Sequence, residues 1–362
     1  MKLTAFLVKL AINVYSFARL RHQNLKLTNK KTFKMSKKIS NTDQTKQSCK
    51  TGVMVSSSNQ KHIVCYSGGH SSALVAIEVT RKFGKENVIL LNHDINSRFE
   101  NEDIKRFKKE VADYLGLKIT YANHQNELSA KLIKNQFEVC IEKGTFVNPA
   151  NRQILCTYVL KTEPFYKFLE ELPKDNEYII YYGFDETEPS RIDRRKTILN
   201  DSGYNSDYPL ALWGNGKFEV LKSFYESKGK NFETICKIEK YESKDHYKRT
   251  INSTEEIGIK RPNTYGVWKH ANCIGCLKAG QQHWYCVYVH DYEVFQMGKD
   301  AEEIIGHSFG KEFLKDIEPK FKRMKEIGIP ANEHIDRGTF WKSAKYYLKQ
   351  STEDLFPCEC FV

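Results

Sequence analysis

The sequence has no apolar run long enough to cross a membrane, and its first 50 residues have almost no acidic charge. Within residues 1–23 the apolar run is interrupted by Lys9 and falls short of the roughly 20 residues that a bilayer span requires. The chain carries 57 Lys or Arg and 45 Asp or Glu, and residues 1–50 hold 12 of these basic residues but only Asp43. The remainder, with 45 basic and 44 acidic residues, is nearly neutral. The net charge of +12 therefore gives little support for a nucleic-acid-binding globular core.

Residues 1–60 are expected to form a basic, disordered extension. Residues 24–60 are rich in Lys, Asn, Ser, Thr and Gln and lack apolar periodicity. Two alternatives account for the N-terminal segment of this extension. It is a targeting presequence, or translation starts later, at Met35 or Met54. We expect a cytoplasmic protein without a membrane partner, because no convincing signal peptide is present.

The two commonest phosphate-binding loops are also missing, since the sequence has neither a Walker lysine nor a G-x-G-x-x-G spacing after its first predicted strand. In their place stands KHIVCYSGGHSSALVA at 61–76, in which an apolar strand runs through two glycines into a helical pattern. Glycines permit a tight turn and a close approach of the backbone, and a helix N-terminus attracts anions. The alternative is an ordinary turn with serine caps. We predict a phosphate-binding loop made of Ser67, Gly68, Gly69, His70, Ser71 and Ser72.

Strands and helices alternate from residue 61 onward. Short apolar runs at 62–66, 87–92, 117–122 and 177–183 are typical of buried parallel strands, and helical spacing separates them. This alternation predicts an α/β fold, a doubly wound, mostly parallel sheet with ligands beyond the carboxyl ends of its strands. We assign 61–222 to this nucleotide-binding domain and 223–362 to a C-terminal region.

Ten cysteines in a chain without a signal peptide favour metal binding or thiol chemistry over disulfides. Cys273 and Cys276 form a C-x-x-C pair on a turn with Gly275, which suits zinc or an iron–sulfur cluster. One pair is half of a four-ligand shell. Cys286 and the terminal pair Cys358 and Cys360 are candidates for the remainder. A redox dithiol, or no shared role at all, is the alternative.

A basic run at 191–196 follows the fourth predicted strand and therefore lies at the ligand-bearing edge of the sheet. Such a run is commonly a solvated surface. Its position instead favours an anion site, with Arg191 as the main contact because a guanidinium binds oxyanions with two parallel hydrogen bonds. Lys161 is the second cation expected at this anion.

Several segments together resemble the phosphoadenosine phosphosulfate (PAPS) reductase-like family of the adenine nucleotide alpha-hydrolase group. The matching segments, in order, are YSGGHSSA (66–73), HDINSRFENED (93–103), LCTYVLKTEP (155–164), GFDETEPSRIDRR (183–195) and RPNTYGVWKHANCIGCLKAG (261–280). The sequence departs from that family in three places. Ser71 replaces the aspartate of the loop signature, Thr157 replaces the second of two adjacent cysteines, and the terminal CECFV lacks the family's glycine and histidine.

The resemblance implies a Rossmann-like nucleotide-binding fold and ATP or PAPS as the bound nucleotide, with Mg²⁺ as an open question because the loop carboxylate is missing. It implies a nucleotide contact for Asp94, a metal-ligand role for Cys156, and catalytic roles for Lys161 and for Cys360 as the nucleophile. The expected reaction is sulfonucleotide reduction, with a thioredoxin-like reductant as partner, or cleavage of ATP between its α and β phosphates. The alternatives are a tRNA or DNA sulfur-transfer component, which would take a nucleic-acid substrate, and a non-catalytic nucleotide-binding regulator.

Overall fold

A computed structural model of the chain describes residues 60–149, 152–214, 219–237, 247–271 and 273–349. The extension at 1–59 and the terminal cysteines Cys358 and Cys360 lie outside these ranges. In the described part, no helix is both long enough and apolar enough to cross a membrane. The boundary that we placed at residue 222 stays a prediction.

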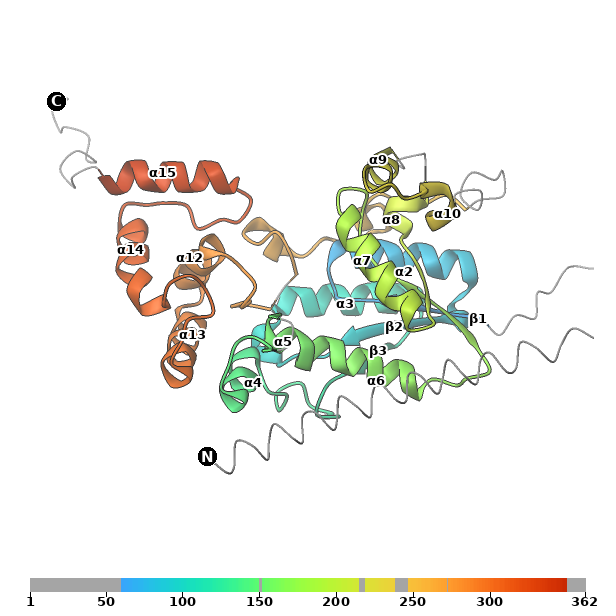
Figure 1. Ribbon diagram of the computed structural model, residues 1–362, viewed down its shortest axis with the longest axis horizontal. Helices are drawn as coiled ribbons and strands as arrows, with labels where there is room; N and C mark the ends of the chain where they lie inside the picture. Colours follow the sequence, from blue (N-terminus) through green and yellow to red (C-terminus); the bar gives the residue numbers. More distant parts are fainter. Residues whose placement is uncertain (1–59, 150–151, 215–218, 238–246, 272, 350–362) are drawn as a thin grey trace, which may run out of the picture. The chain divides into compact units, whose positions relative to one another are not determined.

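One five-stranded sheet in the order β3-β2-β1-β4-β5 forms the centre of the fold, and all of its strand pairs are parallel (Figure 1). This confirms the α/β prediction and four predicted strands. The fifth strand was not predicted, because it is a three-residue polar edge strand without apolar alternation. The strands are β1 (Gln60–Cys65), β2 (Val88–His93), β3 (Ile119–Ala122), β4 (Glu177–Tyr181) and β5 (Asn205–Asp207).

Helices connect the strands and continue beyond the sheet. Those between β1 and β5 are α2 (His70–Phe83), the 3-10 turns η1 (Lys85–Asn87) and η2 (Ser97–Phe99), α3 (Glu102–Leu115), α4 (Gln136–Lys143), α5 (Leu155–Thr157), the π-helical turn η3 (Tyr158–Thr162), α6 (Glu163–Glu171) and α7 (Pro189–Asp201). Those after β5 are α8 (Pro209–Leu212), α9 (Glu219–Ser227), α10 (Phe232–Cys236), the 3-10 turns η4 (Thr254–Ile257) and η5 (Asn263–Gly266), α12 (Gln281–His290), α13 (Tyr292–Ile305), α14 (Leu314–Glu326) and α15 (Arg337–Lys349).

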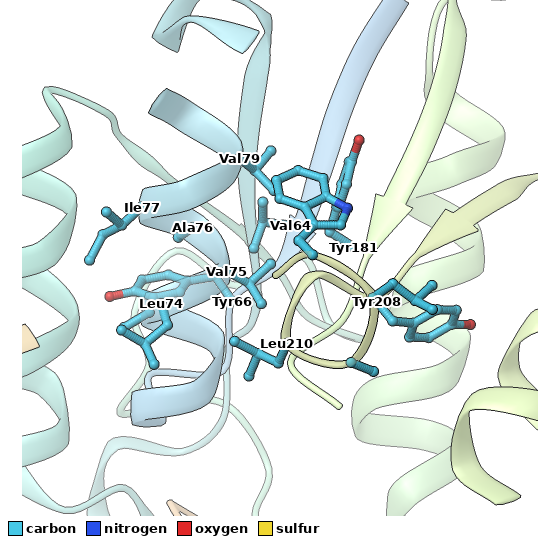
Figure 2. Close-up of a cluster of buried hydrophobic side chains, with 14 of the residues drawn as sticks. Val64, Tyr66, Leu74, Val75, Ala76, Ile77, Val79, Tyr181, Tyr208 and Leu210 are labelled. Atoms are coloured by element: carbon cyan, nitrogen blue, oxygen red, sulfur yellow. The ribbon is translucent and has the colours of Figure 1, made fainter. Parts of the chain in front are cut away.

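Both faces of the sheet are buried under other elements. Successive residues of each strand point to opposite faces, so neighbouring residues enter different cores. Val64 of β1 packs into a core with Val75 of α2 and Tyr208 (Figure 2). Its neighbour Ile63 packs on the other face with Phe165 and Leu169 of α6. The near-continuous apolar strands of the sequence are therefore explained by burial on two sides.

A second large core joins the C-terminal helices to α4 and α5. Trp284 of α12 and Phe295 of α13 pack in one cluster with Phe137 and Cys140 of α4 and Leu155 of α5. This packing holds the C-x-x-C segment beside the residues that follow β3.

Candidate functional site

The loop between β1 and α2 requires glycine at its centre. Gly68 has φ +81°, in the left-handed region that residues with a side chain rarely adopt. A Cβ atom at this position would lie 2.5 Å from Cγ of Lys108. Gly69, by contrast, has φ −80° and caps α2 in an extended conformation. The strand-to-helix turn predicted from Ser-Gly-Gly is thus present, and Gly68 makes it sterically possible.

The loop after β4 approaches the start of α2 backbone to backbone. A Cβ atom on Gly183 would lie 3.0 Å from the carbonyl carbon of Ser71 and 3.0 Å from the amide nitrogen of Ser72. Strands β1 and β4 are sheet neighbours, and from them the chain continues toward opposite edges of the sheet. Parallel sheets bind ligands at such a reversal, beyond the carboxyl ends of the strands.

The hydroxyl groups of the loop do not all serve the same purpose. Ser72 is buried, and its Oγ donates a 2.8 Å hydrogen bond to the carbonyl oxygen of Gly69 within the first turn of α2. Ser67 and Ser71 are exposed. The backbone N–H of His70 donates to the hydroxyl of Tyr265 in η5 at 3.0 Å. Ser67 and Ser71 are therefore accessible to a ligand, whereas Ser72 completes the helix.

Asp94 follows β2 beside a buried ion pair. Lys108, with a side chain only 3% exposed, lies under Gly68 and forms an ion pair with Glu100 at 2.7 Å. Burial raises the pKa of Asp94, and the charge of Lys108 opposes this increase. The acidic segment at 93–103 thus contributes the partly buried carboxylates of Asp94 and Glu100.

A cavity of about 100 Å³ joins the loop to the cysteine region. Ser67 and His93 line it at the ends of β1 and β2, and Lys161 and Cys273 line it from later parts of the chain. Lys161 lies in the π-helical turn η3, close to Cys273. The negative charge of Cys273 is the main reason that the pKa of Lys161 is raised.

Cys140 and Cys156 are hydrogen-bonded through their thiols. This contact lowers the pKa of Cys140, and it is the largest cause of the raised pKa of Cys156. Cys276 is close enough for the charges of Cys273 and Cys156 to raise its pKa, although burial is the larger cause. Cys156, Cys273 and Cys276 therefore lie within reach of the charge of Lys161, and Cys140 contacts Cys156.

Cys286, which we expected as a ligand, lies elsewhere. It is fully buried in α12, and burial followed by the charge of Glu333 raises its pKa to about 12. No thiol of the described residues contributes to that shift. Its role as a metal ligand stays a prediction, and Cys140 is the thiol that contacts Cys156.

The donor chemistry of the four thiols fits a soft metal. In the described residues no group of three or more His, Cys, Asp or Glu side chains converges as the ligands of a single ion do. Four cysteines are the usual ligands of an iron–sulfur cluster, which spreads them over several iron atoms rather than around one centre.

The basic run of α7 divides into two groups. Arg191 forms an ion pair with Glu188, has its guanidinium carbon 4.2 Å from the ring centroid of Phe184, and is 59% exposed. Arg195 instead lowers the pKa values of Cys65 and His93, which both line the cavity. The charge that acts on the cavity therefore comes from Arg195 rather than from Arg191.

His93 is a residue that the sequence did not single out. Its Nδ1 atom is buried and has no hydrogen-bond partner among the residues described. Burial and the charges of Lys161 and Arg195 lower its pKa to about 4, so the imidazole is neutral at physiological pH. No spacing signal marks His93, Cys140 or Arg195 as members of one site, since each comes from a different element.

Comparisons with known proteins do not name a relative of this chain. No family model matches the sequence, and no curated protein matches it.

Proposed function

We propose that the protein is an enzyme that binds ATP or PAPS at the loop of residues 67–72 and carries out sulfur chemistry beside it. The observation that carries this proposal is the cavity lined jointly by Ser67, His93, Lys161 and Cys273. The hydroxyl of Ser67, the ammonium of Lys161 and the thiols of Cys65 and Cys273 line it at the carboxyl edge of a parallel sheet. We further propose that the fold is of the Rossmann-like adenine nucleotide alpha-hydrolase type.

The roles of the individual residues follow from their positions. The backbone of residues 67–69 and the N-terminus of α2 receive the nucleotide phosphates. Lys161 and Arg195 neutralise the charge of the leaving anion, and Asp94 contacts the nucleoside beyond β2. Cys140, Cys156, Cys273 and Cys276 would hold an iron–sulfur cluster, which supplies electron-transfer or Lewis-acid chemistry when bound.

Two reactions use the same anion site. In reduction, a thiolate attacks the sulfur of PAPS and the bond from sulfur to the phosphate oxygen breaks. A second thiol then releases sulfite as a disulfide forms, and a thioredoxin-like reductant restores the thiols. In ATP cleavage, an acceptor oxygen attacks the α phosphorus and pyrophosphate leaves. Cys360, the expected nucleophile of the reduction, lies outside the described residues.

The experiment is to incubate the purified protein with ATP or PAPS and to measure pyrophosphate and sulfite together with calorimetric binding. Gly69→Val, which adds bulk to the loop without requiring a new backbone conformation, is expected to abolish nucleotide binding while the circular dichroism spectrum stays unchanged. Wild-type protein that binds neither nucleotide would overturn the proposal. Binding without either product would identify a regulator.

A further inference from the structure

A second recess, of about 310 Å³, opens on the C-x-x-C segment and is separate from the nucleotide cavity. Its volume is at the lower end of the range for small-molecule sites. Cys276 is part of its wall, whereas Cys273 lines the nucleotide cavity. The two cysteines of one motif thus belong to two different cavities.

The second recess is cationic. Lys269, Lys278 and Arg337 line it, and no ion pair joins these three side chains to a carboxylate within the described ranges. The nearby carboxylate of Glu333 is already engaged. It accepts hydrogen bonds from Nδ1 of His283 at 2.5 Å and from the backbone N–H of Lys269 at 2.9 Å. Glu333 also lines the recess, so three cations face one carboxylate and the recess keeps a net positive charge.

The wall that carries Cys276 is held rigidly. The backbone N–H of Cys276 donates to Nε2 of His283 at 3.3 Å, while the other ring nitrogen binds Glu333. His283 is 6% exposed and packs against Trp268. A fixed wall lowers the entropic cost of binding, because the site needs no ordering when a ligand arrives.

We propose that this recess, which Cys276 lines, binds a phosphate ester that serves as the acceptor or second substrate. The inference rests on the proposed function for the ligand's role as a co-substrate. The binding itself can be measured independently. Lysine and arginine side chains around a fixed wall are suited to phosphate oxygens, and Arg337 can form a bidentate contact.

Two probes distinguish a free phosphate ester from the phosphate backbone of a polymer. Cytidine 5′-monophosphate represents a free phosphate ester, a short single-stranded oligonucleotide represents a polymer backbone, and uncharged cytidine is the control. Binding of either phosphate probe, measured by calorimetry, supports the proposal and identifies the source. Binding of neither probe, or equal binding of cytidine, overturns it.

Charge-reversal variants locate the bound probe. Arg337→Glu is expected to weaken probe binding by about tenfold or more, in line with the loss of a charge-assisted hydrogen bond. Lys345→Glu is the matched control, because Lys345 is an exposed residue farther along the same helix and does not line the recess. Lys269→Glu provides a second variant from a different element. Equal weakening by Lys345→Glu, or no weakening by Arg337→Glu and Lys269→Glu, rejects the recess as the binding site.

Gly69→Val separates this inference from the proposed function. The variant is expected to lose ATP binding and to keep binding of the phosphate probe, and Arg337→Glu is expected to show the reverse. If Gly69→Val keeps ATP binding, the nucleotide loop is wrongly assigned while the recess result still holds. If the probe is lost in Gly69→Val and retained in Arg337→Glu, the probe occupies the loop and the recess proposal fails.

Discussion

Lys161 and Cys273 lie close together, and this proximity brings the turn after α5 to the C-x-x-C segment. Both residues line the cavity that begins at Ser67. The pKa values of Cys156 and Cys276 are raised, and the positive charge of Lys161 opposes this increase in both. A single cation therefore acts on both the cavity and the thiols.

Cys140→Ser is expected to remove the metal, and Cys286→Ser is expected to retain it. Cys140 shares a hydrogen bond with Cys156, whereas Cys286 is buried apart from the other thiols in α12. Loss of a bound metal also removes its contribution to folding, so the melting temperature of Cys140→Ser should fall further than that of Cys286→Ser. Iron and zinc analysis with the visible spectrum of anaerobically purified protein provides the measurement. Metal loss from Cys286→Ser alone would restore our initial ligand set.

Gly68→Ala is expected to destabilise the protein more than Gly258→Ala. Both glycines have positive φ, +81° and +79°, so each alanine carries a similar backbone penalty, on the order of 1 kcal/mol. Only at Gly68 would the added Cβ atom collide with another side chain, that of Lys108. Urea unfolding of the two variants isolates the steric part of the effect. Equal losses of stability would show that Lys108 moves aside without cost.

Arg195→Gln is expected to weaken nucleotide binding by about tenfold or more, since a charge-assisted hydrogen bond contributes roughly 1.5–3 kcal/mol. Arg191→Gln is the comparison, and we expect a smaller loss because Arg191 is paired with Glu188. Titration calorimetry with ATP and PAPS tests both. A larger loss in Arg191→Gln would favour the residue that the sequence alone suggested.

His93 is expected to make stability depend on pH between about 6.5 and 4. Burial, Lys161 and Arg195 lower its pKa from 6.5 to about 4 in the folded protein. The unfolded chain therefore binds more protons in this window, and stability falls as the pH falls. His93→Gln removes this titration, so its melting temperature should decline less steeply toward pH 4 than that of the wild type. Parallel curves for the two proteins would contradict a neutral, buried His93.

The sequence by itself determined the features that are local along the chain. Apolar runs separated by helical spacing identified four strands of the sheet, and Ser-Gly-Gly after the first of them identified the turn into α2, where Gly68 adopts positive φ. Periodicity and turn chemistry depend on neighbouring residues, so they can be read without knowing the path of the chain. The polar edge strand β5 carries no such pattern and was missed.

Only the tertiary structure decided which distant residues share a site. Cys140, which the sequence did not suggest, contacts Cys156, and the charge of Arg195 acts on Cys65 and His93 at the cavity. His93 gained its low pKa from two cations on other elements, and Cys273 and Cys276 were divided between two recesses. These relationships depend on how α4, η3, α7 and the C-x-x-C segment pack around the sheet. Packing between segments far apart in sequence leaves no periodic signal, so residue spacing could not reveal them.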